Sequence, residues 1–444
     1  MLEQERIFSI LELLKLFDNS NKVASNLVQN YFRSRKHMGS KDRKFISNSF
    51  WNILRHRYKI DWHLTNIGIE ITNEKKILLE LFFLNVHYQN DLLQIKKLFI
   101  LKYRDFKIVT DEELDFMNNL IFDEFFNNKM PEHIYYELPK TIVNSVKRSF
   151  PNDWKQVLLS LNKEASFDVR INNLKIKSRE EIKILLQNID ASFEHSKYSH
   201  LGIRFSKRYP IEGHKFFKNG IIEIQSEASQ LASILLDVRP GMSVADICAG
   251  AGGKSLILAD IMKNKGRILS LDTNQKRLEN AGIRFKRAGV HNVERRLVES
   301  NWSVSGLENK FNLVLIDAPC SGIGTWSRSP DSRFNFDNKK LTDLIEIQSE
   351  LLSKASMMVA PGGKLAYIVC SFLAEESIDQ IENFKENNKI KFSEINMINM
   401  WNDTVFKKNG VEYPFENEQK KSILINPAKH KMDGFFISMF QRRR

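Results

Sequence analysis

The sequence has 444 residues, of which 42% are hydrophobic and 27% are charged, and its net charge is +13. This length exceeds one ordinary hydrophobic core, so we expect two or three domains, and the apolar content excludes a disordered chain. The positive charge favours a polyanionic partner, nucleic acid before a membrane surface, with a merely lysine-rich surface as the alternative.

Membrane and metal functions receive no support from the sequence. No apolar stretch approaches the roughly 20 residues of a spanning helix, and the acidic start Met1–Arg6 lacks the charge of a signal peptide. The three cysteines cannot all pair, and none lies in a CxxC motif. We therefore expect a cytosolic protein without a metal site and without membrane contact.

Residues 1–130 are predicted to form a basic helical domain. Ile7, Ile10, Leu14 and Phe17 recur at helical spacing, and no proline occurs before Pro131. A second helix is expected to begin with Ser40 as its N-cap. One face of this helix would carry Phe45, Ile46, Phe50, Ile53, Leu54 and Tyr58.

Residues 131–205 are predicted to form a small α+β module. Pro131, Pro139 and Pro151 interrupt this stretch, and Phe167–Asn172 alternates as a strand does.

Residues 206–444 are predicted to form an α/β domain with a doubly wound, Rossmann-like parallel sheet. Helical segments separate four short apolar runs: Ser243–Ile247, Ile268–Leu271, Leu313–Ile316 and Leu365–Val369. Ligands of such sheets bind at the carboxyl ends of the strands, where the motifs below fall.

A glycine-rich loop, Asp246–Ser255, follows the first of these runs. It breaks the P-loop pattern because residue 248 is Cys, and it breaks the dinucleotide pattern because residue 255 is Ser. Asp272 ends the next run, where its carboxylate can accept both hydroxyls of a ribose. The spacing favours a nucleoside cofactor such as S-adenosylmethionine over a purely structural glycine turn.

Two cysteines end the last two runs. Asp317-Ala-Pro-Cys320 follows the third run and Cys370 closes the fourth, so both thiols are expected at one edge of the sheet. A helix start after Cys370 would favour its thiolate. A lone cysteine in an apolar run is usually packing, which is our interpretation of the Cys248 side chain, but the shared edge favours chemistry for Cys320 and Cys370.

With these motifs, the chain resembles the bacterial ribosomal RNA cytosine-C5 methyltransferases of the RsmB (Sun/Fmu) type. The motifs that carry the resemblance are, in chain order, Gly39–Ile46, Ile53–Arg57, Val169–Asn172, Gln225–Gln230, Cys248–Lys254, Asp272, Asp317–Gly322, Val369–Ser371 with Glu375 and Glu376, and Asp433–Phe436. The chain differs from the family pattern at two positions, with Ala251 in place of proline and Val369 in place of threonine.

The resemblance implies a role for each motif. The N-terminal helices would be a NusB-like RNA-binding domain, and the substrate would be 16S ribosomal RNA bound by a monomer. Cys370 would be the nucleophile, Cys320 would assist its release, and Asp317 would contact the base and the cofactor. S-adenosyl-L-methionine would be held by Cys248, Ala249, Gly250, Ala251, Gly252, Gly253, Lys254, Asp272 and, near the adenine, Glu299, with Asn301 as the competing residue.

RNA flanking the target would be bound by the basic helices and the central module. We expect Lys254 in the active site and Arg328 and Arg333 on the RNA backbone.

Three other functions compete with this one. A DNA cytosine methyltransferase would use Cys320 as its nucleophile, but no Glu-Asn-Val motif follows Cys320. A transfer RNA methyltransferase would share all the motifs above. An RNA-binding assembly or antitermination factor with a vestigial catalytic domain is disfavoured, because the acids and both thiols are present.

Overall fold

The computed structural model describes residues 1–20, 23–85, 87–88, 91–100, 125–176, 181, 186–187, 191–388, 390–416 and 421–444. The chain divides into two compact units, and both are discontinuous in sequence. The helical unit comprises Met1–Asn144, Asp153–Lys163 and Trp326–Asp337. The sheet unit comprises Ser145–Asn152, Glu164–Thr325 and Asn338–Arg444.

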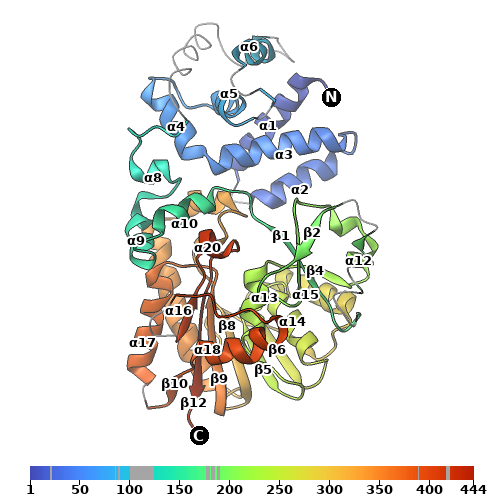
Figure 1. The fold of residues 1–444 in the computed structure, drawn as a ribbon, viewed down its shortest axis with the longest axis vertical. Helices are drawn as coiled ribbons and strands as arrows, with labels where there is room; N and C mark the ends of the chain where they lie inside the picture. Colours follow the sequence, from blue (N-terminus) through green and yellow to red (C-terminus); the bar gives the residue numbers. More distant parts are fainter. Residues whose placement is uncertain are drawn as a thin grey trace. The chain divides into compact units, whose positions relative to one another are not determined.

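The helical unit is a bundle in which α1 packs against α2, α3 and α5 (Figure 1). Its α-helices are α1 (Glu3–Asp18), α2 (Ala24–Ser34), α3 (Ser40–Arg55), α4 (Arg57–Asn66), α5 (Asn73–Phe83), α6 (Leu92–Ile100), α8 (Glu132–Tyr135) and α10 (Trp154–Leu161). Short 3-10 helices are η1 (Lys140–Ile142) and η4 (Pro330–Asn335), and α9 (Val143–Ser149) continues into residues of the sheet unit.

The two helices predicted in this region are present, with two corrections. The four apolar residues expected on α1 are all buried. Gly39 is the N-cap of α3, so Ser40 is its first helical residue and not its cap. Tyr58 lies on α4, because the chain leaves the helical conformation at His56. The predicted domain boundary at residue 130 stays a prediction.

One segment from the middle of the sequence belongs to the helical unit. Trp326–Asp337 is anchored there by Arg333, whose side chain is completely buried. Its Nη1 donates hydrogen bonds to the carbonyl oxygens of Arg55 (3.2 Å) and Glu137 (3.0 Å) and to Oδ1 of Asn162 (2.9 Å). The expectation that Arg333 contacts an RNA backbone is therefore wrong, because the guanidinium is used to join three distant segments. Arg328 is exposed.

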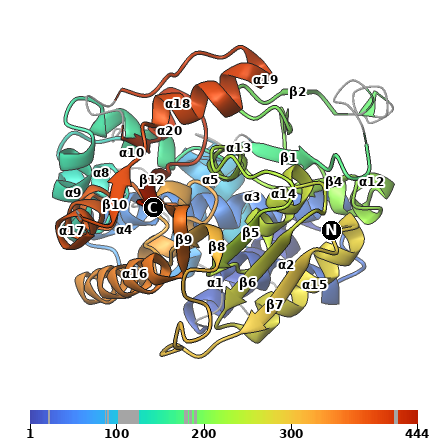
Figure 2. The same ribbon diagram turned by 90° about the horizontal axis from the view of Figure 1, so that it is seen from below.

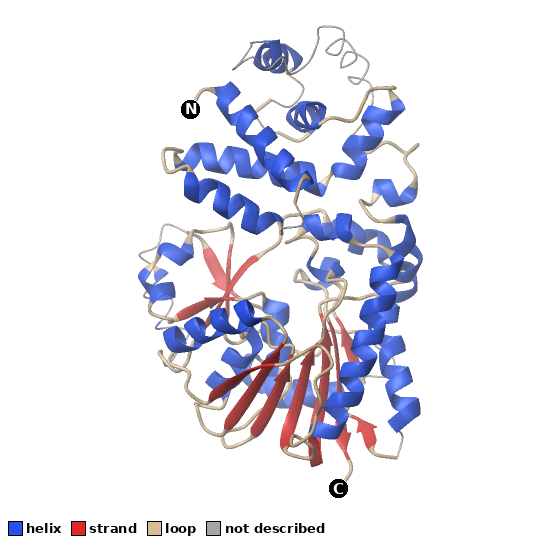
Figure 3. Ribbon diagram, turned by 180° about the vertical axis from the view of Figure 1, so that it is seen from behind, coloured by secondary structure: helices blue, strands red, loops and turns tan. Residues whose placement is uncertain are grey.

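The sheet unit contains a small antiparallel sheet and a large mixed sheet, which are visible as separate groups of red strands in Figure 3. The small sheet has the order β2-β3-β1-β4. Its elements are β1 (Phe167–Ile171), β2 (Phe193–His195), β3 (Gly202–Phe205), η2 (Ile211–Gly213), α12 (Lys215–Lys218) and β4 (Ile222–Ile224).

The large sheet has the order β10-β12-β9-β8-β5-β6-β7, with β11 paired to β12. Strands β5 to β9 are parallel, and β12 runs antiparallel beside β9. The strands are β5 (Ser243–Ile247), β6 (Arg267–Asp272), β7 (Val293–Leu297), β8 (Phe311–Asp317), β9 (Val359–Val369), β10 (Phe392–Glu394), β11 (Ser422–Leu424) and β12 (Phe436–Arg442).

Helices cover both faces of this sheet (Figure 2). Alternate residues of β8 face opposite ways: Leu313 and Leu315 pack with α13 to α15 and α18, whereas Val314 and Ile316 pack with α16 and α17. The helices and turns are α13 (Glu227–Ile234), α14 (Gly253–Ile261), α15 (Gln275–Ala288), η3 (Ile323–Thr325), α16 (Asn338–Met358), η5 (Ala374–Glu376), α17 (Ile378–Asn388), α18 (Met397–Trp401), η6 (Asn402–Phe406), α19 (Lys407–Asn409) and α20 (Pro427–His430).

This architecture confirms the predicted α/β, Rossmann-like fold with a helical region before it. Strand β7 is an additional parallel strand that the hydrophobic pattern does not predict.

Within the parts of the chain that the structure describes, no helix combines the length and the apolar character needed to cross a bilayer.

Candidate active site

Two cysteine-bearing loops meet at the carboxyl ends of β8 and β9. Asp317, the last residue of β8, pairs with Ile368 near the end of β9, so the two strands end side by side. The sulfur atoms of Cys320 and Cys370 lie 3.4 Å apart. The structure thus brings together the two thiols that the sequence places at one sheet edge.

The two thiols differ in their electrostatics. The hydrogen bond with Cys370, together with burial and the nearby Glu376 carboxylate, raises the pKa of the Cys320 thiol well above its usual range. Cys320 therefore keeps its proton at neutral pH and can donate it to the sulfur of Cys370.

An ion pair connects the glycine loop to the acid–cysteine loop. Nζ of Lys254, in the first turn of α14, lies 2.6 Å from a carboxylate oxygen of Asp317. The Lys254 side chain is 7% exposed and that of Asp317 is 32% exposed, so the acid is partly accessible to solvent and the lysine is buried beside it. Lys254 is thus not a solvated surface lysine.

The glycine loop after β5 uses left-handed backbone at Cys248, Gly250 and Gly252, with φ of 64°, 58° and 74°. A Cβ at Gly252 would lie 2.6 Å from the Phe285 ring, so no larger residue fits. A Cβ at Gly250 would meet no atom within 4 Å, so its backbone borders open space. Such a loop leaves room for a ligand directly against the main chain.

Two carboxylates lie beside this loop. Asp272 accepts hydrogen bonds from the backbone N–H groups of Gly250 (2.7 Å) and Asn274 (2.8 Å), one at each oxygen. Each oxygen has a further lone pair for a ligand hydroxyl. Asp246 is completely buried, accepts from Ser255 Oγ at 2.5 Å, and keeps Oδ1 without a partner among the described residues. Burial raises the pKa of Asp246 to about 7.

These features fit a nucleoside cofactor. The loop has free space at Gly250, Asp272 retains acceptor capacity, and the glycines permit close approach of a ligand to the backbone. S-adenosylmethionine has no phosphate group, so a site for it needs no phosphate-binding motif. This agrees with the broken P-loop and dinucleotide motifs.

Three polar residues that sequence reasoning missed support the loop from behind. Gln225 Nε2 donates to the Gly253 carbonyl (3.3 Å), and Arg284 Nη1 donates to the Ala251 carbonyl (2.7 Å). Glu223 of β4 holds Arg284 at 3.3 Å. The Gln225–Gln230 motif was the only sequence signal for any of them. These bonds hold the loop through its carbonyl groups, which alanine and proline both have, so Ala251 retains this contact.

The Val169–Asn172 motif is a structural anchor. Arg170, almost fully buried, donates to Gln225 Oε1 (3.0 Å) and to Asp260 of α14 (3.2 Å). The small sheet is thereby tied to the helix that begins at the cofactor loop.

The adenine position is less constrained. Glu299 follows β7, and the neighbouring Val298 N–H donates to the backbone carbonyl of Asp272 at 3.1 Å. Both Glu299 and Asn301 are exposed. The assignment of Glu299 to the cofactor stays a prediction.

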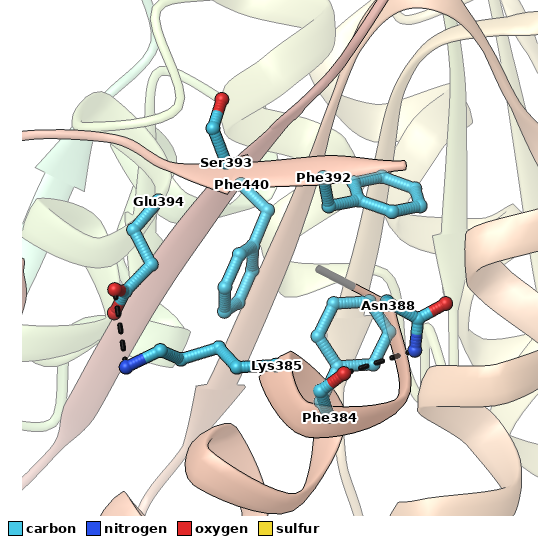
Figure 4. Close-up of a pocket in the computed structure, with 7 residues that line it drawn as sticks. All are labelled: Phe384, Lys385, Asn388, Phe392, Ser393, Glu394 and Phe440. Atoms are coloured by element: carbon cyan, nitrogen blue, oxygen red, sulfur yellow. Dashed lines mark hydrogen bonds and ion pairs between the residues drawn. The ribbon is translucent and has the colours of Figure 1, made fainter. Parts of the chain in front are cut away.

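A separate cavity of about 180 Å³ lies at the opposite end of the sheet (Figure 4). Phe440, which lines it, pairs with Leu365, whereas the site is at the Val369 end of β9. Lys385 is neutralised there by Glu394 at 3.2 Å. This cavity is therefore not part of the candidate active site.

Comparisons with known proteins agree with this site. Residues 233–441 match the family described as 16S rRNA methyltransferase RsmB/F, and residues 138–212 match the ferredoxin-like domain described as RsmF/B-like. The probable ribosomal RNA small subunit methyltransferase B of Bacillus subtilis is 30% identical over 52% of this chain and 50% of its own length. The corresponding protein of Synechocystis sp. is 27% identical over 63% of this chain and 61% of its own length. The matched regions thus span about half to three fifths of these relatives.

Two solved structures share the fold. The crystal structure of PH0851 has a TM-score of 0.79, 22% identity, and 99% coverage of both chains. A methyltransferase homologue from Pyrococcus horikoshii has a TM-score of 0.56 and 24% identity, and covers 70% of this chain and 97% of its own. The fold, the motifs and the two family matches agree, and residues 138–212 and 233–441 of the chain match the RsmB/F family of methyltransferases.

Proposed function

We propose that the protein transfers a methyl group from S-adenosylmethionine to C5 of a cytosine in RNA, with 16S ribosomal RNA as the substrate. The observation that carries this proposal is the pair of sulfur atoms 3.4 Å apart, Cys320 and Cys370, at the strand end that holds Asp317. The names of the relatives, ribosomal RNA small subunit methyltransferase B, support ribosomal over transfer RNA.

Residues of the glycine loop, Cys248–Lys254, together with Asp272 and Glu299, would hold the cofactor. When bound, S-adenosylmethionine supplies an electrophilic methyl group.

Cys370 would supply the nucleophile that activates the base. C5 of cytosine is a poor nucleophile, and addition of a thiolate to C6 makes C5 enamine-like. After methylation, a base takes the C5 proton as the Cys370 sulfur leaves, and the Cys320 S–H, 3.4 Å away, can stabilise the departing thiolate by donating a hydrogen bond.

Asp317 would bind the polar edge of the cytosine and share a proton with N3 as charge develops on the ring. Lys254, at 2.6 Å, fixes the orientation of that carboxylate. A base stacked in a duplex cannot present C6 to a thiol, so the target must be unpaired or flipped out.

Release of hydrogen from C5 tests the proposed chemistry. We expect an RNA with tritium at cytosine C5 to release one tritium to water for each methyl group transferred from labelled cofactor. The Cys370→Ala variant should give neither signal, and a DNA oligomer of the same sequence should be a poor substrate. Methyl transfer without tritium release would place the methyl group on another atom, and equal activity on DNA would exclude RNA specificity.

Replacement of Asp272 by alanine is expected to weaken cofactor binding by about tenfold or more, because hydrogen bonds to an ionised acceptor contribute roughly 1.5–3 kcal/mol. The loop also loses the acceptor for the Gly250 N–H. Isothermal titration calorimetry with S-adenosylhomocysteine measures the effect. Glu279→Ala, an exposed acid on α15, is the matched control and should bind normally. An unchanged dissociation constant for Asp272→Ala would assign the ribose to another residue.

A further inference from the structure

We propose that Glu376 is a positioning residue, whose buried carboxylate fixes the Cys320 loop against the Cys370 loop and sets the distance between the two thiols. This inference rests on the proposed function for the roles of the two thiols. The short distance between the two sulfur atoms, which the inference explains, is a property of the fold. Glu376 lies in η5, six residues after Cys370 and outside the reacting groups assigned above.

The Glu376 side chain links the two loops directly. It is completely buried. Its Oε1 accepts the backbone N–H of Ser321 at 2.7 Å, and its Oε2 accepts the Ser321 hydroxyl at 2.5 Å. Ser321 follows Cys320 directly, so both bonds act on the residue adjacent to the thiol. The Glu376 carboxylate, which belongs to the segment after Cys370, therefore holds the loop that carries Cys320.

A third element completes the network. Gln348 of α16 donates through Nε2 to Glu376 Oε1 (3.2 Å) and to the carbonyl of Pro319 (2.8 Å). Both sequence neighbours of Cys320 are thus fixed by hydrogen bonds, Pro319 to Gln348 and Ser321 to Glu376. No cation forms an ion pair with Glu376 among the described residues, so the carboxylate is satisfied by hydrogen bonds alone.

The Glu376 backbone is fixed as well. Its carbonyl oxygen accepts the Tyr367 hydroxyl at 2.8 Å, and Tyr367 is a buried residue of β9, three residues before Cys370. Ser321 Oγ also lies 3.2 Å from Ser371 Oγ, next to Cys370. Because both ends of the link are anchored, loss of the carboxylate should release the Cys320 loop and leave the Cys370 strand in place.

Disulfide formation measures this arrangement without RNA. Diamide takes two hydrogens from a pair of thiols and leaves one disulfide, while its N=N bond is reduced to a hydrazine. In the wild-type protein, oxidation should lower the free thiols counted after denaturation from three to one, with Cys248 remaining. We expect Glu376→Ala to slow this reaction about tenfold or more, because two or more buried hydrogen bonds are lost.

A conservative variant of Glu376 and a variant of its neighbour distinguish loss of thiol positioning from a general loss of structure. Glu376→Gln retains an acceptor for the Ser321 N–H and should react within about threefold of wild type, since the Ser321 hydroxyl can turn to accept from the amide. Glu375→Ala is the matched control, because Glu375 bonds Ser145 and not the cysteine loops. Titration with S-adenosylhomocysteine should be unchanged in all of them. If Glu376→Ala fails to fold, Ser321→Ala should show a smaller slowing.

The RNA reaction then tests the consequence for catalysis. Cys320→Ala is expected to accumulate a covalent protein–RNA adduct on a denaturing gel, because the release of Cys370 is slowed. Glu376→Ala should accumulate part of the same adduct. Wild-type rates of disulfide formation in both Glu376→Ala and Ser321→Ala, or a wild-type protein in which the two thiols do not pair, would overturn the inference. An adduct in Cys320→Ala and none in Glu376→Ala would also overturn it. Absence of an adduct in Cys320→Ala would instead contradict the proposed function.

Discussion

Replacement of Cys320 by alanine is expected to accumulate a covalent protein–RNA adduct that survives denaturing electrophoresis. The Cys370 sulfur would still add to C6, but its release would lack the neighbouring S–H that lies 3.4 Å away. A thioether is not broken by detergent, so the adduct should appear as a slowly migrating band. The adduct should require S-adenosylmethionine, because the stalled step follows methylation.

Two further variants fix the assignment. Cys370→Ala should abolish methyl transfer while leaving cofactor binding intact, and the double variant of Cys320 and Cys370 should give no adduct. In an enzyme of the DNA type, the roles would be exchanged: Cys370→Ala would give the adduct and Cys320→Ala would be inactive without one. A gel of the three variants, with and without cofactor, distinguishes the two arrangements.

Replacement of Arg333 by methionine is expected to destabilise the helical unit by roughly 3–5 kcal/mol, the range for removing one member of a buried charged network. Methionine keeps the length of the side chain, but three acceptors on Arg55, Glu137 and Asn162 lose their donor. Burial leaves no water to replace it. Hydrogen exchange followed by mass spectrometry should show faster exchange in α3, with β5 unchanged.

Arg328 provides the matched control for this change. It lies in the same segment but is exposed, so Arg328→Met should alter stability by no more than about 0.5 kcal/mol. If Arg328 contacts an RNA phosphate, its loss should weaken RNA binding and lower the salt dependence by about one counterion. Equal protection of α3 in wild type and Arg333→Met would contradict the structural role of the guanidinium.

The sequence is informative where local patterns determine structure. Buried parallel strands are apolar runs, so β5, β6, β8 and β9 could be predicted, and strand order then placed both cysteines at one edge. Strand β7 was missed because it is an edge strand whose residues, Val293-Glu-Arg-Arg-Leu297, are mostly exposed and charged. The break between α3 and α4 carries no glycine or proline to mark it.

The residues that support the site could not be predicted for a different reason. Glu376 and Gln225 lie in motifs of the family resemblance, but nothing in the sequence gives either a partner, and Arg284 lies in no motif. The importance of all three comes from partners far away in the chain. Arg333 looked like an RNA contact because arginines usually lie at surfaces. Its burial depends on three segments that converge only in the folded helical unit.

The discontinuity of the helical unit has a consequence for biosynthesis. Its last piece, Trp326–Asp337, emerges from the ribosome only after four of the eight strands of the large sheet, β5 to β8, have been made. Until then, the carbonyl groups of Arg55 and Glu137 have no guanidinium to bind, and the N-terminal helices remain incomplete. A domain that closes this late departs from the usual order in which N-terminal domains finish first during translation. The helical unit should therefore be protease-sensitive in nascent chains that stop before residue 326, and it should be resistant in chains that extend past residue 337.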